Sequence, residues 1–105
     1  MPFSKVAKTS QLDEGWVIEV NVKGRPYAIC KVRGEIHALS GECSCTGGPL
    51  GSGRIQDGLL VCPWHGWRYD VHTGVMEYDG SISVPTYPVM QIGEWICIDA
   101  TNAIA

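Results

Sequence analysis

The sequence has no apolar run approaching the length of a membrane-spanning helix, so nothing in it predicts a membrane protein. Its amino terminus lacks the basic and then apolar layout of a secretory signal. Basic residues are few: 8 Lys and Arg against 11 Asp and Glu give a net charge of −3, which argues against nucleic acid as a partner. We therefore expect a cytoplasmic protein with no membrane or nucleic-acid partner.

The sequence also lacks any segment in which apolar residues recur with a helical period. Short β-branched and aromatic runs are instead separated by turns, which use many of the 13 Gly and 6 Pro. This pattern predicts an all-β fold of small antiparallel sheets. Residues 84–88 carry two prolines, Pro85 and Pro88, and should not lie in the centre of a sheet. Strands are expected at residues 3–8, 15–22, 27–33, 36–39, 59–61, 67–71, 75–78, 89–92 and 94–99.

No repeat or linker divides the 105 residues, so residues 1–105 are expected to form a single domain. The five cysteines are an odd number, which argues against a framework made only of disulfides. In a reducing cytoplasm, clustered cysteines are interpreted as metal ligands before they are interpreted as disulfides. The cysteines therefore point to a metal centre.

Four candidate ligands lie on two short loops with the spacing C-x-C-x16-C-x2-H. They are Cys43, Cys45, Cys62 and His65. Pairs of closely spaced soft ligands on two loops are how proteins enclose a tetrahedral metal ion or an iron–sulfur core. Glycines in the first loop would allow close backbone approach to such a group. No Ser or Thr lies at a recognisable spacing from a base, so no catalytic residues are predicted.

The two loops and the residues after them resemble the two ligand boxes of Rieske-type iron–sulfur ferredoxins. The first reads Cys43-Ser44-Cys45-Thr46-Gly47-Gly48-Pro49-Leu50, and the second reads Cys62-Pro63-Trp64-His65-Gly66-Trp67-Arg68-Tyr69-Asp70. The resemblance covers essentially the whole chain and implies a cluster-binding subdomain at about residues 41–70. It also implies a [2Fe-2S] cluster, with Cys43 and Cys62 on the inner iron and His65 on the outer iron.

Cys45 departs from the family pattern, which has histidine at that position. We interpret the chain as a His-to-Cys ligand variant with three Cys and one His around the cluster. An added thiolate charge favours the oxidised form, so the potential is expected between roughly −400 and −150 mV. High-potential Rieske proteins carry an additional cysteine in each box, where this chain has Gly48 and Trp64. The resemblance is therefore to the low-potential ferredoxins of ring-hydroxylating oxygenase systems.

By this resemblance, the chain is an electron carrier and not an enzyme by itself. It would pass single electrons from an NAD(P)H-dependent flavin reductase to a terminal oxygenase. Two alternatives stay open: a mononuclear iron or zinc Cys3His structural site, and a Rieske-type small subunit of a larger reductase. Cys30 and Cys97, in expected strands, are interpreted as buried inert thiols. His37 and His72 are interpreted as ordinary residues, and Tyr69 as a hydrogen-bond donor to a cysteine sulfur.

Overall fold

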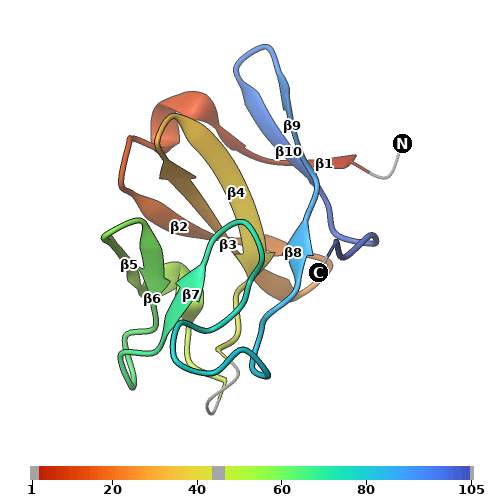
Figure 1. Cartoon of the computed structure of the whole chain (residues 1–105). Helices are drawn as coiled ribbons and strands as arrows, with labels where there is room; N and C mark the ends of the chain where they lie inside the picture. Colours follow the sequence, from red (N-terminus) through yellow and green to blue (C-terminus); the bar gives the residue numbers. More distant parts are fainter. Residues whose placement is uncertain (1–2, 44–46, 105) are drawn as a thin grey trace.

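The computed structural model describes residues 3–43 and 47–104, which form three antiparallel sheets and two short 3-10 helices (Figure 1). The all-β prediction is confirmed. Among these residues, no helix is long and apolar enough to cross a membrane. Cys45 lies outside the described residues.

The central sheet contains four strands in the order β2-β3-β4-β8. Tight turns join the first three strands, and positive φ angles at Lys23, Gly24, Arg33 and Gly34 match the twist of a two-residue hairpin turn. The short β8 pairs only with β4, so the proline-bearing segment lies at a sheet edge, as expected. The strands are β2 (Val17–Val22), β3 (Arg25–Val32), β4 (Glu35–Ser40) and β8 (Thr86–Tyr87).

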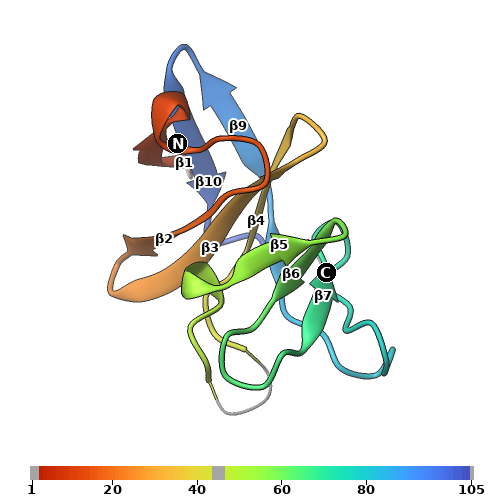
Figure 2. The ribbon, with the colours of Figure 1, turned by 90° about the vertical axis from the view of Figure 1, so that its left-hand side faces the viewer.

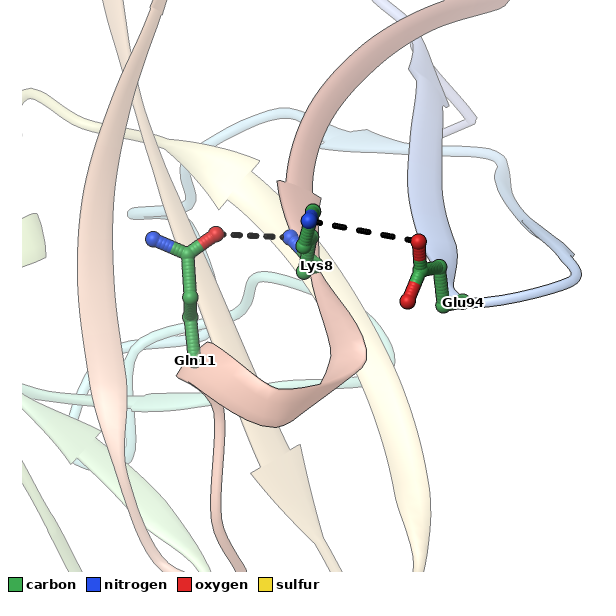
Figure 3. Close-up of polar contacts among 3 residues, drawn as sticks. All are labelled: Lys8, Gln11 and Glu94. Atoms are coloured by element: carbon green, nitrogen blue, oxygen red, sulfur yellow. Dashed lines mark hydrogen bonds and ion pairs between the residues drawn. The ribbon is translucent and has the colours of Figure 1, made fainter.

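A second sheet brings the two ends of the described chain together. It has the order β1-β10-β9, formed by β1 (Phe3–Lys8), β9 (Val89–Ile92) and β10 (Trp95–Asp99). Lys8 makes two polar contacts at the end of β1. Its backbone N–H donates to Gln11 Oε1 at 2.7 Å, and its Nζ lies 3.9 Å from Glu94 Oε1 (Figure 3). The first contact stabilises the 3-10 helix η1 (Thr9–Gln11), where the chain turns toward β2.

The third sheet, which we call the loop sheet, carries the candidate ligands. It consists of β5 (Arg54–Gln56), β6 (Leu59–Val61) and β7 (Arg68–Asp70), and follows the 3-10 helix η2 (Leu50–Ser52). The expectation that residues 41–58 contain no strand was wrong, because β5 has only one half-buried apolar residue between two exposed polar ones. Residues 75–78 form isolated bridges instead of the expected strand.

Alternation along β3 divides the core in two. Ala28, Cys30 and Val32 pack with buried residues of the loop sheet, whereas Tyr27 and Ile29 pack with Ile96 and Ile98 of the second sheet. The central sheet is therefore covered on both faces. Two views show the hairpin of β9 and β10 at one end of the molecule and the connecting loops of the loop sheet at the other (Figures 1 and 2).

Candidate metal centre

The second ligand loop, residues 62–67, joins β6 to β7. Val61 pairs with Arg68, and the N–H of Cys62 donates to the carbonyl of Trp67 at 2.8 Å. The N–H of Gly66 then donates back to the carbonyl of Cys62 at 3.0 Å. Gly66 has φ +70°, a conformation that glycine adopts without strain. These bonds define a compact loop that begins at a ligand candidate.

The first ligand loop, residues 43–48, has the same hydrogen bonds at its described ends. The N–H of Cys43 donates to the carbonyl of Gly48 at 2.8 Å, and the N–H of Gly47 donates to the carbonyl of Cys43 at 3.0 Å. Gly47 has φ +79°. Cys43 and Cys62 thus occupy corresponding positions, each opening a loop whose fifth residue is a glycine in the left-handed region. The described ends of the first loop therefore match the second loop in their hydrogen bonds.

Close packing at Gly48 brings the two loops together. A Cβ atom at this position would lie 2.9 Å from Cys62 Sγ and 3.2 Å from the ring of Trp64. Both cysteines are almost fully buried, whereas His65 is exposed and Trp64 keeps 58% of its surface in contact with solvent. The site therefore has a buried thiol side and an exposed imidazole side.

Tyr69 connects the loop sheet to the first ligand loop. Its side chain is fully buried, and its hydroxyl lies 3.1 Å from Cys43 Sγ. If the sulfur is a thiolate, the hydroxyl must be the donor, and the bond stabilises negative charge on sulfur. The structure thus contains the cysteine–tyrosine contact expected from the sequence.

A group of side chains that could hold a single metal ion lies outside the two ligand loops. Among residues 3–43 and 47–104, just one group of His, Cys, Asp and Glu has its ligand atoms all within 4.8 Å of one another, and that group does not include Cys43, Cys62 or His65. A mononuclear tetrahedral site would hold its ligand atoms about 3.3–3.8 Å apart. The described candidates Cys43, Cys62 and His65 do not by themselves form such a group, and the fourth candidate, Cys45, lies outside the described residues.

The remaining two cysteines, Cys30 and Cys97, lie in strands and not in the two loops. Cys30 in β3 and Cys97 in β10 are both buried within the sheets, and burial raises the pKa of Cys30 to about 12. A thiol with such a pKa stays protonated and unreactive at neutral pH. Their described positions agree with the interpretation as inert core residues.

A third loop with the same hydrogen bonds follows β7, and sequence reasoning missed its contact with β4. The N–H of Asp70 donates to the carbonyl of Val75 at 2.9 Å, the N–H of Gly74 donates to that of Asp70 at 2.7 Å, and Gly74 has φ +76°. This loop holds His72 against His37, with ring centroids 4.4 Å apart. Burial, and then the neighbouring His72, lower the pKa of His37. No short sequence spacing connects these histidines.

The whole chain resembles known iron–sulfur proteins. Residues 3–88 match the family described as Rieske [2Fe-2S] domain. The chain is 32% identical over 90 residues to the ferredoxin component of the naphthalene 1,2-dioxygenase system of Pseudomonas aeruginosa, covering 85% of this chain and 86% of that protein. It is also 32% identical over 98 residues to apoptosis-inducing factor 3 of Mus musculus, covering 92% of this chain but 16% of that longer protein.

Solved structures give the same result. The ferredoxin of carbazole 1,9a-dioxygenase from Nocardioides aromaticivorans IC177 superposes with a TM-score of 0.82 at 26% identity, covering 91% of this chain and 95% of the other. The Sphingomonas yanoikuyae B1 ferredoxin superposes equally well, with a TM-score of 0.82 at 26% identity, and the match covers 91% of this chain and 96% of that chain. The likeness therefore extends over nearly the full length of these small proteins.

Proposed function

Because this chain belongs to the Rieske [2Fe-2S] domain family, we propose that it is a one-electron carrier that holds a [2Fe-2S] cluster between its two cysteine-bearing loops. The observation that supports this most directly is the pair of matched loops, each opening on a buried cysteine and packed together at Gly48. The cluster, when bound, supplies reversible one-electron chemistry. The chain supplies the ligands, the hydrogen bonds and the shielding from water.

We propose Cys43, Cys45, Cys62 and His65 as the ligands. The burial of Cys43 and Cys62 suits an inner position, and the exposure of His65 suits an outer one, close to an electron-transfer partner. Cys45 completes the set on the grounds of sequence, because it stands two residues after Cys43 in the box that resembles the family pattern. The residues around them, about 41–70, would be the cluster-binding part of a single domain.

The mononuclear alternative has less support. A Cys3His zinc or iron site would use the same four candidate residues. The family match over residues 3–88 is to a [2Fe-2S] domain, and this match is what favours the cluster.

For partners, we propose an NAD(P)H-dependent flavin reductase as donor and a terminal oxygenase as acceptor. Support comes from the relative named as a ferredoxin component of a naphthalene 1,2-dioxygenase system, which has nearly the same length as this chain. A second candidate is a Rieske-type small subunit of a larger reductase. The match to 16% of the length of apoptosis-inducing factor 3 supports only that a similar sequence can form part of a longer protein. Stable copurification with a large subunit would favour this second candidate.

Substitution of Cys45 by His tests the proposed ligand set. Exchange of a thiolate for a neutral imidazole removes about one negative charge from the site, so the potential measured by protein-film voltammetry should rise from the roughly −400 to −150 mV range. The Cys97→Ser variant, altered within β10 of the second sheet, is the control and should keep the original potential. With one histidine ligand, the unmodified protein should show a pH slope no steeper than about 59 mV per unit. An unchanged potential in Cys45→His would remove Cys45 from the ligand set.

A further inference from the structure

A second cluster of potential metal ligands lies at the opposite end of β7 from the cysteine-bearing loops. Glu35 and His37 are two residues apart on β4 and therefore point to the same face of the central sheet. His72 comes from the loop of residues 70–75, which rises beside β4 after β7 (Figure 1). Two residues of β4 and one residue of the loop after β7 thus lie close together.

The geometry of this group suits a single ion. One ligand atom each from Glu35, His37 and His72 lies within 4.8 Å of the others. Tetrahedral zinc, with bonds of about 2.0–2.2 Å, would place such atoms about 3.3–3.5 Å apart. The exposed Glu35 and His72 side chains are free of the core and can rotate toward that spacing.

The backbone already holds His72 in position. Asp70 Oδ1 accepts hydrogen bonds from the N–H groups of His72 at 2.8 Å and Thr73 at 3.2 Å, which fixes the loop. Gly74 packs so closely on the carbonyl of Val84 that a Cβ would lie 2.0 Å from its oxygen. The backbone of the loop is therefore anchored on both sides, so binding an ion would cost that backbone little conformational entropy.

Two unsatisfied polar atoms belong to a cavity that the two histidines of this group line and Glu35 does not. His37 Nε2 and Thr86 Oγ1 are buried and have no hydrogen-bond partner among the described residues. Both residues, together with His72, line a cavity of about 220 Å³. Thr86 is only 4% exposed. Buried polar atoms are normally hydrogen-bonded, so these two atoms suit a cavity with a polar occupant.

We propose that Glu35, His37 and His72 form a zinc site separate from the cysteine-bearing loops. Two imidazoles and a carboxylate are a ligand set that zinc accepts with three protein ligands, which leaves a fourth position for water. The ion would join β4 of the central sheet to the loop sheet. It would act as a cross-link that stabilises the packing between the two, independently of the proposed electron-carrier function.

Calorimetric titration with Zn²⁺ tests this site on the intact iron–sulfur protein after removal of loosely bound metal with a chelator. We expect one Zn²⁺ per chain. The His37→Gln, His72→Gln and Glu35→Gln variants should each bind zinc more than ~100-fold more weakly, beyond the 10–100-fold typical of an outer-shell change. Glu94→Gln, at an exposed carboxylate paired only with Lys8, is the matched control and should bind zinc like the unmodified protein.

Zinc K-edge X-ray absorption identifies the ligands directly. The expected shell contains nitrogen and oxygen at about 2.0–2.2 Å with no sulfur near about 2.3 Å, and the visible absorption of the protein should not change on zinc addition. Sulfur in the shell, or bleaching, would place zinc at the cysteines and overturn the proposal. Equal zinc affinity in all variants, or no binding, would overturn it too. Glu35 is exposed, so Glu35→Gln keeps the test valid if a histidine variant fails to fold.

Discussion

At the two ends of β7, the chain makes the same turn twice with different side chains. In residues 62–67 and 70–75, the first N–H bonds the sixth carbonyl and the fifth N–H bonds the first carbonyl. Cys62 opens one loop with a buried thiol against Gly48 of the first ligand loop. Asp70 opens the other, and its carboxylate accepts bonds from N–H groups of its own loop.

This difference indicates that the backbone conformation of the two loops does not determine their chemistry. A glycine at the fifth position and the two backbone hydrogen bonds define this conformation. It occurs both in the loop that begins with cysteine and in the loop that begins with aspartate. The first residue decides whether the loop turns a side chain toward a neighbouring loop or uses it to satisfy its own backbone.

Exchange of the first residue in each loop should have opposite consequences. Cys62→Ser should lose most of its iron and labile sulfide, because an inner ligand is gone. Asp70→Ala should keep both and lose only the two bonds to its own loop, ~1–2 kcal/mol or about 5–15 °C in melting temperature. Iron and sulfide analysis with thermal melting measures the two effects. Equal iron loss in the two variants would contradict the assignment of different roles.

Substitution of the fifth residue by alanine should destabilise the loop of residues 70–75 more than the loop of residues 62–67. At Gly74, a Cβ would meet the Val84 carbonyl oxygen at 2.0 Å in addition to the strain of φ +76°, so Gly74→Ala should cost more than ~4 kcal/mol. At Gly66, a Cβ would meet no atom of the described residues within 4 Å, so the φ strain alone costs ~1–2 kcal/mol. Thermal melting compares the two. A larger shift for Gly66→Ala would show that the loops are anchored differently from this description.

Removal of the Tyr69 hydroxyl should affect only the cysteine side of β7. Its bond to Cys43 Sγ stabilises negative charge, which increases on reduction, so Tyr69→Phe should lower the potential by roughly 40 mV, equivalent to ~1 kcal/mol. Tyr87→Phe is the control, because Tyr87 packs in the other core, against Tyr27. Voltammetry that gave equal shifts in both variants would exclude a specific hydrogen bond.

The smallest effect is expected at Glu14, which lies outside both loops and serves as a reference site for the comparison. Its carboxylate accepts N–H bonds from Arg33 at 2.6 Å and Gly34 at 2.7 Å, and these bonds lower its pKa. A lowered pKa in the folded state contributes stability above pH 4.5 that is lost as pH falls. Glu14→Gln should therefore melt slightly lower at pH 7 and match the unmodified protein at about pH 3. A difference that grew on acidification would reverse the assigned sign.

The sequence predicted most of the sheet architecture because alternation and turn residues are local signals. The alternate faces of β3, for example, correspond to the two cores, Cys30 on one side and Ile29 on the other. The three-residue β5 was not predictable from alternation, since its single apolar residue carries no period. The candidate ligands Cys43, Cys62 and His65 were named from spacing and resemblance, and the structure places the two cysteines at matching loop positions.

The group at Glu35, His37 and His72 could not be predicted in this way. His37 belongs to a strand and His72 to a turn, and the sequence between them contains the whole of the first two loops. Only the packing of the loop sheet on the central sheet brings their rings to 4.4 Å. Long-range contacts of this kind depend on tertiary packing, which no local pattern encodes.

Iron, zinc and labile-sulfide content, measured with an optical spectrum on chelator-treated protein, tests the central claim most directly. The expected result is a coloured protein with two irons and two sulfides per chain, alike in the unmodified chain and in His72→Gln, because His72 lies at the other end of β7. A colourless protein with a single zinc or iron at the cysteines and no labile sulfide would contradict the account.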